Sequence, residues 1–180
     1  MNWLGNLCQK EIEASDVVLD MGCGIMQATL DTVPSYPHTR LRCAELVGLD
    51  LFDNYLEVIK HKENVATVKA DIIRPPIREK SADVVLLLDV LEHFDLDEAQ
   101  GVLSDAEKLA RRKIIVHTPF VWSDNEINLY GLGDNALQRH RSLITVEFLR
   151  ARGFAVKLIT RRWRRRFWKS QKTIFAVKVN

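Results

Sequence analysis

The chain has 180 residues, of which 47% are hydrophobic and 28% charged, a globular composition that excludes a disordered chain, a collagen-like repeat and a disulfide mini-protein. The formal net charge is +2, but the segment from Arg161 to Lys172 holds seven of the 26 basic residues and no acidic one. The remaining 19 basic and 24 acidic residues therefore carry a net charge of −5. The length predicts one domain spanning residues 1–180.

The termini and the cysteines predict the cellular setting. The N-terminus has neither a basic nor an apolar leader segment, and the longest aliphatic run, residues 84–88, is far shorter than the about 20 residues that cross a bilayer. Cys8, Cys23 and Cys43 form no CxxC pair, which favours reduced thiols. We therefore expect a cytoplasmic protein without a transmembrane segment.

Short apolar runs alternate with helix-like stretches along the chain. The runs are continuous rather than alternating, which is typical of parallel strands covered on both faces. They lie at residues 16–20, 45–50, 65–70, 82–88 and 113–118. Helices are expected at residues 26–32, 53–62, 95–109 and 145–152. The apolar residues at helical spacing in the third are Leu96, Ala99, Leu103, Ala106 and either Leu109 or Ala110.

Local signals place the ends of two helices and the last strands. Asp95 and Glu98 form a D-x-x-E start that resembles a capping box, and Gly153 suits a left-handed C-cap. Residues 154–160 and 173–179 should be strands joined by the basic segment as an antiparallel hairpin. The expected fold is α/β, a doubly wound, mostly parallel seven-stranded sheet with a C-terminal antiparallel β-hairpin.

The turn after the first strand carries the first functional motif. Asp20, Gly22 and Gly24 form D-x-G-x-G, and Gln27 occupies the place where a dinucleotide-binding fingerprint has its third glycine. The motif resembles the first motif of the class I S-adenosylmethionine-dependent methyltransferases, with Met26 at that family's third glycine position. The resemblance implies a Rossmann-like methyltransferase fold with S-adenosyl-L-methionine as cofactor.

Acidic residues end the next two strands. Asp50 could accept two charge-assisted hydrogen bonds from vicinal ribose hydroxyls, or it could cap the helix that follows. The resemblance implies that Asp50 binds the ribose and that Asp71 and Ile72 contact the adenine; a loop aspartate is the alternative for Asp71. The cofactor-binding residues expected from the resemblance are Asp20, Gly22, Cys23, Gly24, Asp50, Leu51, Asp71, Ile72, Asp89 and Val90.

After the fourth strand, residues 89–94 resemble the family's "EH" stretch. His93, and His140 further along, are candidate catalytic residues, because an imidazole can deprotonate an acceptor. Alternatively, Glu92 and His93 only shape the pocket. The sequence lacks an N/D-P-P-Y/F motif and a cysteine near the fourth or fifth strand, which argues against amino-methylating DNA enzymes and cytosine-C5 enzymes. No His or Cys cluster has metal-ligand spacing, so no metal is expected.

Two further segments are candidates for binding the methyl acceptor. Residues 121–143 show no clear periodicity. Together with Thr118 and Pro119 before them, they form a T-P…N..Q.H.S pattern that resembles a family subset in which this loop closes over the site. Alternatively, Gln138, His140 and Ser142 cap the next helix and pin the loop. The basic segment mixes cations with aromatics and could hold RNA, an acidic lipid or another anionic partner. The acceptor-site candidates are Trp122, Asn128, Tyr130, Arg164, Arg165 and Arg166.

The sequence therefore predicts a methyltransferase that acts by in-line displacement on an unidentified acceptor: a small molecule, a lipid, RNA or a protein. The competing hypothesis is a non-catalytic methyltransferase-like module that uses the hairpin to hold RNA or another anionic partner.

Overall fold

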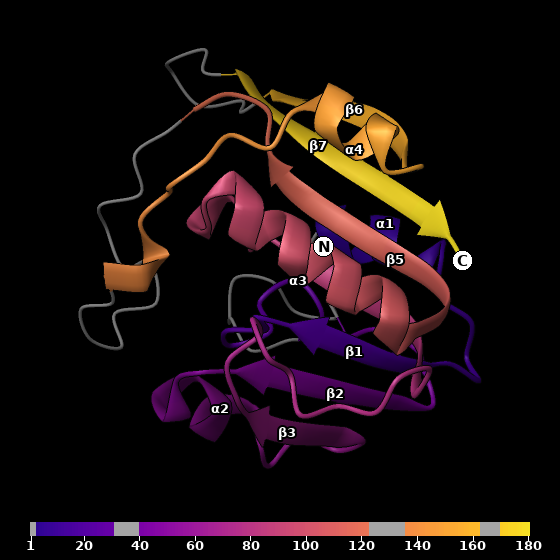
Figure 1. Cartoon of the computed structure of the whole chain (residues 1–180). Coiled ribbons are helices and arrows are strands. Elements are labelled where there is room, and N and C mark those ends of the chain that lie inside the picture. The colour runs from indigo at the N-terminus through magenta and orange to yellow at the C-terminus, as the bar shows by residue number, and fades with distance from the viewer. Residues whose placement is uncertain (1–2, 31–39, 123–135, 163–169) are drawn as a thin grey trace.

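A seven-stranded sheet forms the centre of the protein in the computed structural model, which describes residues 3–30, 40–122, 136–162 and 170–180 (Figure 1). The strand order is β3-β2-β1-β4-β5-β7-β6. β7 pairs antiparallel with both β5 and β6, and the other described strand pairs are parallel. The strands are β1 (Val17–Met21), β2 (Glu45–Asp50), β3 (Val65–Lys69), β4 (Ala82–Leu88), β5 (Ala110–Pro119), β6 (Ala155–Arg162) and β7 (Ser170–Val179). The predicted fold class and the C-terminal hairpin are confirmed.

The chain order reverses at the centre of this sheet. β1 pairs in parallel with β2 on one side and with β4 on the other. In open α/β sheets, ligands bind at the carboxyl ends of the strands beside such a reversal. The topology therefore places any crevice for a cofactor next to the residues that follow β1, β2 and β4.

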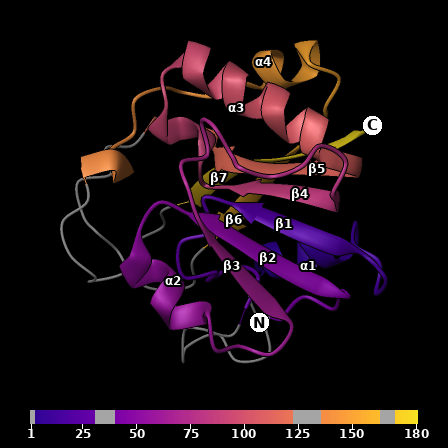
Figure 2. The ribbon, with the colours of Figure 1, turned by 60° about the horizontal axis from the view of Figure 1, so that its bottom comes forward.

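Helices cover both faces of the sheet (Figure 2). On one face, α3 (Leu96–Leu109) packs apolar side chains against β4 and β5, and α4 (Val146–Ala151) packs against β6. On the other face, α1 (Trp3–Gln9) and α2 (Asp53–Ile59) bury Leu4, Cys8, Leu56 and Ile59 against β1, β2 and β4. Of the described helices, none is long and apolar enough to cross a membrane.

The N-terminus of α3 forms the predicted capping box. The Asp95 carboxylate accepts the backbone N–H of Glu98 at 2.9 Å, and the Glu98 carboxylate accepts the N–H of Asp95 at 3.3 Å. The stripe expected on α3 needs one correction, because Leu96 is 49% exposed and Val102 is buried instead. Thr145 caps α4 through the N–H of Phe148, and Gly153 has the left-handed φ of 86° expected after that helix.

Removing the α3 cap should have a small, measurable effect. Asp95→Ala should lower the free energy of unfolding by about 1 kcal/mol, because it leaves the first N–H groups of the helix without their acceptor. Asp97→Ala is the matched control, since Asp97 lies in the same first turn and contributes only its charge. Urea denaturation of both variants measures the difference; equal losses would show that the capping bond contributes nothing.

The helix expected at residues 26–32 is wrong over its described part. Met26 has a φ of 54°, which a right-handed helix cannot contain, and the N–H groups of Thr29 and Leu30 both donate to the Met26 carbonyl to close turns. Residues 31–39 lie outside the described part of the chain. Helix α1 was not expected from the sequence, because seven residues carry too little periodicity to detect.

Candidate functional site

The chain turns sharply after β1 through Gly22, Gly24 and Met26, which all have positive φ. Gly22 and Gly24 have φ values of 70° and 50°. The N–H groups of Gly22 and Cys23 donate to the carbonyl of Leu49 in β2, at 2.7 and 3.1 Å. A Cβ on Gly22 would lie 2.9 Å from Cγ2 of Val90, so the turn also packs directly against the segment after β4. Glycine is needed here both for the backbone conformation and for the space.

Met26 explains the departure from the family's glycine pattern. It keeps a left-handed φ of 54° without being glycine, which costs about 1–2 kcal/mol, and its side chain is fully buried. The space that it fills exists because β2 has a glycine opposite: a Cβ on Gly48 would lie 2.5 Å from Cε of Met26 and 2.9 Å from Sγ of Cys23. The glycine-like turn is therefore retained, and the side chain points into the core.

Asp50 joins the end of β2 to this turn. One carboxylate oxygen accepts the N–H of Gly24 at 2.8 Å and the other accepts the N–H of Phe52 at 3.0 Å. Burial raises the pKa of Asp50, while these backbone hydrogen bonds lower it. A carboxylate offers about four acceptor sites, so Asp50 retains acceptor capacity beyond these bonds. Leu51, beside it, is exposed.

Asp20 is held inside the protein below the turn. Its carboxylate accepts the hydroxyl of Thr29 at 3.0 Å, and it is almost completely buried. Burial raises the pKa of Asp20 from 3.8 to about 7, the hydroxyl of Thr29 lowers it somewhat, and the Asp50 charge raises it further. Asp20 thus supports the turn from within the fold.

The residues after β3 form a tight turn. The Asp71 carboxylate accepts the N–H of Ile73 at 2.9 Å, and the Asp71 side chain is exposed. Ile72 is buried in the same core cluster as Val90 and Leu91. The carboxyl end of β3 therefore presents Asp71 to solvent and uses Ile72 as core.

Asp89 ends β4 in a left-handed conformation with a φ of 56°. Its N–H donates to the carbonyl of His117 in β5, and its carboxylate oxygen lies 2.8 Å from Nδ1 of His117. His117 is buried, and the Trp3 ring of α1 meets it edge-on with 5.3 Å between ring centroids. Sequence reasoning missed both His117 and Trp3, because neither belongs to a local motif.

The short helix η1 (Leu91–His93) carries the second predicted cluster. Glu92 is buried, and one of its carboxylate oxygens accepts the Thr118 hydroxyl at 3.0 Å. Its carbonyl accepts the N–H groups of Arg141 and Ser142, at 2.7 and 3.2 Å. Burial, and then the charge of Asp89, raise the pKa of Glu92 well above its usual range.

These backbone hydrogen bonds bring the two candidate catalytic histidines together. The rings of His93 and His140 lie 5.1 Å apart in an edge-on arrangement, and the ring of Trp122 lies 6.3 Å from that of His140. Burial and the neighbouring His140 lower the pKa of His93. Residues named from two separate sequence segments, 89–94 and 121–143, thus lie close together.

The alternative role for the loop before α4 is correct in part, because Gln138 and Ser142 hold the loop but α4 has a different cap. Gln138, in the short helix η2 (Ala136–Gln138), donates to the hydroxyl of Tyr55 in α2 at 3.0 Å. The Ser142 N–H bonds to Glu92, and α4 is capped by Thr145 instead. The loop is therefore fastened to α2 and η1. Asn128, Tyr130, Arg164, Arg165 and Arg166 lie outside the described residues.

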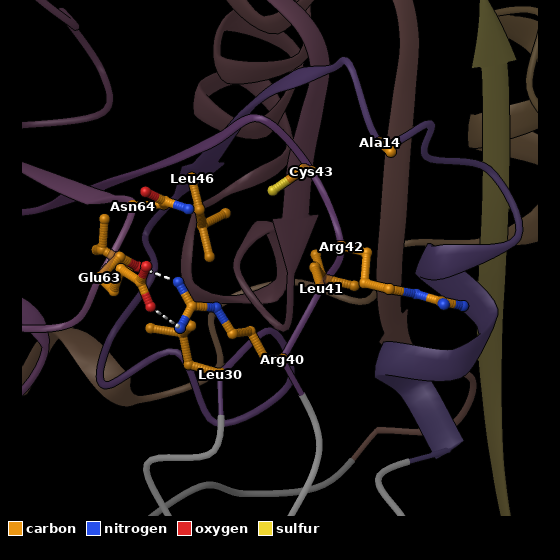
Figure 3. Close-up of a pocket in the computed structure, with 10 residues that line it drawn as sticks. Ala14, Leu30, Arg40, Leu41, Arg42, Cys43, Leu46, Glu63 and Asn64 are labelled. Atoms are coloured by element: carbon orange, nitrogen blue, oxygen red, sulfur yellow. Dashed lines mark hydrogen bonds and ion pairs between the residues drawn. The ribbon is translucent and has the colours of Figure 1, made fainter.

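A cavity of about 300 Å³ lies elsewhere, near the amino ends of β2 and β3 (Figure 3). Arg40 is directed toward Glu63 on one side of it, and Arg42 is directed away from that pair. Leu46 and Val65, near the starts of β2 and β3, help to line it. The cavity is thus distinct from the crevice at the carboxyl ends of the strands.

Comparisons with known proteins agree with this geometry. A sequence model of a family described as a methyltransferase domain matches residues 19–114, more than half of the chain. No curated protein matches the sequence. Among solved structures, BH2331 from Bacillus halodurans C-125 has a TM-score of 0.69 at 13% identity, over 99% of each chain. YcgJ from Bacillus subtilis has a TM-score of 0.67 at 15% identity, over 98% of this chain and 97% of its own.

A third solved structure contains a cofactor. The magnesium protoporphyrin IX methyltransferase ChlM of Synechocystis PCC 6803, with bound S-adenosylmethionine, has a TM-score of 0.58 at 19% identity. The match covers 97% of this chain and 76% of that one. At these identities the solved structures show a common fold, and the sequence model shows the family. The chain belongs to the methyltransferase domain family and is a methyltransferase.

Proposed function

We propose that the chain binds S-adenosylmethionine where β1, β2 and β4 end and transfers its methyl group to an acceptor. The observation that supports this most is the joining of the Gly22–Gly24 turn to Asp50, through the 2.8 Å hydrogen bond from the Gly24 N–H. A glycine turn lets the backbone approach a ligand closely, and a carboxylate at the next strand end can bind a diol. ChlM, which has this fold, was solved with the cofactor bound.

The residues present suit such a ligand. Asp50 would accept the ribose hydroxyls with its remaining acceptor capacity, and Asp71, exposed at the end of β3, would accept the amino group of the adenine. Cys23, Gly24 and Leu51 would line the turn, and Ile72 and Val90 would support it from the core. Asp89, half-exposed at the end of β4, would face the cationic end of the cofactor.

When bound, S-adenosylmethionine supplies an electrophilic methyl group on a sulfonium. The chain's part is to hold the acceptor in line and to accept its proton, since positioning alone provides much of the acceleration in such displacements. His93 suits the second role because its lowered pKa keeps the imidazole neutral at pH 7. His140 and Trp122 would contact the acceptor beside it.

The acceptor can be identified by labelled methyl transfer. The protein is incubated with methyl-labelled S-adenosylmethionine and fractionated cell extract, with and without nuclease. We expect label in one fraction, with nuclease sensitivity separating RNA from small-molecule, lipid and protein acceptors. Absence of label from every fraction, while the cofactor binds, would contradict methyl transfer to a component of that extract.

A further inference from the structure

A carboxylate and two imidazoles converge beside the end of β4. One ligand atom from each of Glu92, His93 and His140 lies within 4.8 Å of the other two. Ligand atoms bound at about 2.0–2.2 Å to a tetrahedral ion are about 3.3–3.6 Å apart, so side-chain adjustments of about an ångström would close the set. We propose that these residues bind a divalent transition metal ion.

The surroundings of Glu92 favour a metal ligand. Thr118 donates to Oε2 and fixes the orientation of the carboxylate. Oε1 is buried, and no other described residue donates a hydrogen bond to it. Leaving a buried carboxylate oxygen without a partner is costly, and coordination to a cation is one way to satisfy it.

The histidines are also held as metal ligands usually are. Nδ1 of His93 lies 3.4 Å from the carbonyl oxygen of Arg139, and a hydrogen bond there leaves Nε2 with its lone pair. Ligating imidazoles commonly direct their second nitrogen to a backbone carbonyl in this way. His140 is positioned by the bonds from Arg141 and Ser142 to the Glu92 carbonyl.

The segment that carries His140 has a second attachment. The Arg141 guanidinium bonds to Asp95 at 3.0 Å and to Glu98 at 2.7 Å, at the start of α3. Figure 1 shows this segment running past that end of the helix on its way to α4. The protein therefore brings His140 to His93 through several contacts, although 46 residues separate them in sequence.

Two imidazoles and one carboxylate leave coordination positions open. This donor set is found in catalytic zinc sites and in non-haem iron sites. An ion here would lower the pKa of a bound hydroxyl, so the acceptor would bind through oxygen and His93 would act as a ligand in place of a base. This role for the acceptor rests on the proposed methyltransferase function, whereas metal binding itself does not.

Cobalt(II) tests the site through its visible ligand-field bands. Chelator-treated protein is titrated with cobalt chloride in the absence of S-adenosylmethionine. We expect bands that saturate at one equivalent, disappear on addition of zinc, and shift on addition of acetohydroxamate, an oxygen chelator that needs open positions. If acetohydroxamate does not shift the bands, the ion has no open coordination position. If no saturable bands appear, the metal-site proposal is wrong.

Variants locate the ion. Thr118→Val removes a hydrogen bond to the ligand Glu92 and should lower cobalt affinity by about 10–100-fold. His93→Ala and His140→Ala each remove a ligand and should lower the affinity by more than that. The exposed His61 and the half-buried Cys43 are controls, and His61→Ala and Cys43→Ser should change nothing. Bands that persist unchanged in both histidine variants would place the ion elsewhere and overturn the proposal.

The two proposals can fail separately. Cobalt binding without any affinity for S-adenosylmethionine would contradict the proposed function and leave the metal site intact. Affinity for S-adenosylmethionine without cobalt binding would contradict the metal site and leave the proposed function intact. Thermal unfolding of each variant checks that the fold is retained.

Discussion

Replacing Gly22 with alanine should lower the free energy of unfolding by about 2–5 kcal/mol. The φ of 70° costs about 1–2 kcal/mol for a residue with a side chain. The added Cβ would also lie 2.9 Å from Cγ2 of Val90, and overpacking costs about 1–3 kcal/mol. Gly22→Ala should therefore disturb the turn after β1 and its packing against the segment after β4.

Gly101 supplies a control with the opposite sign. It lies inside α3, and a Cβ there would meet no atom within 4 Å. Gly101→Ala should stabilise the protein by about 0.5–1 kcal/mol, because alanine suits a helix better than glycine. Adding Val90→Ala to Gly22→Ala should relieve the contact and leave the backbone strain. Urea denaturation measures all three; a neutral Gly22→Ala would contradict the described turn.

Replacing Asp20 with asparagine should change how stability depends on pH. The pKa of Asp20 is about 7 in the folded protein, compared with its usual value of 3.8. At a pH between these two values, the folded state therefore keeps a proton that the unfolded state has lost. Stability contributed by this group is complete below about pH 4, falls as the pH rises and levels off above about pH 7. The difference amounts to about 4 kcal/mol at 1.36 kcal/mol per pKa unit.

Asp20→Asn should therefore be more stable than the wild type at pH 8, and the advantage should disappear toward pH 4. An asparagine oxygen can still accept the Thr29 hydroxyl, so the local contact is retained. The informative quantity is the difference in unfolding free energy between the two proteins from pH 4 to pH 8. A difference that does not vary with pH would contradict a raised pKa at Asp20.

Much of the fold could be predicted from the sequence because its strands are continuous apolar runs. The first five strands lie at these runs, and β6 and β7 lie where residues 154–160 and 173–179 were predicted to form a hairpin. The cap at Asp95 follows from two residues three positions apart. The predicted helix at residues 26–32 failed because Met26 takes a backbone conformation normally reserved for glycine. That choice depends on the empty space at Gly48, which lies in another strand.

Part of the candidate site could likewise be predicted from local sequence, and part depends on contacts between distant segments. The turn at Gly22 and Gly24 and the aspartate that follows β2 are local motifs, so sequence spacing reveals them. The meeting of Glu92 and His93 with His140 depends on hydrogen bonds between η1 and the loop before α4. Sequence spacing therefore gave no sign of a metal-binding group, and the expectation of no metal rested on local spacing alone.

The turn after β1 and Asp50 should together bind S-adenosylmethionine. Isothermal calorimetry with S-adenosylmethionine or its demethylated product tests this on the wild type, Asp50→Asn and the surface control Asp105→Ala. We expect one-site binding that is unchanged in the control and weakened by about 1.5–3 kcal/mol in Asp50→Asn, because a charge-assisted hydrogen bond is lost. No heat at high micromolar ligand, or equal affinity in all three proteins, would contradict it.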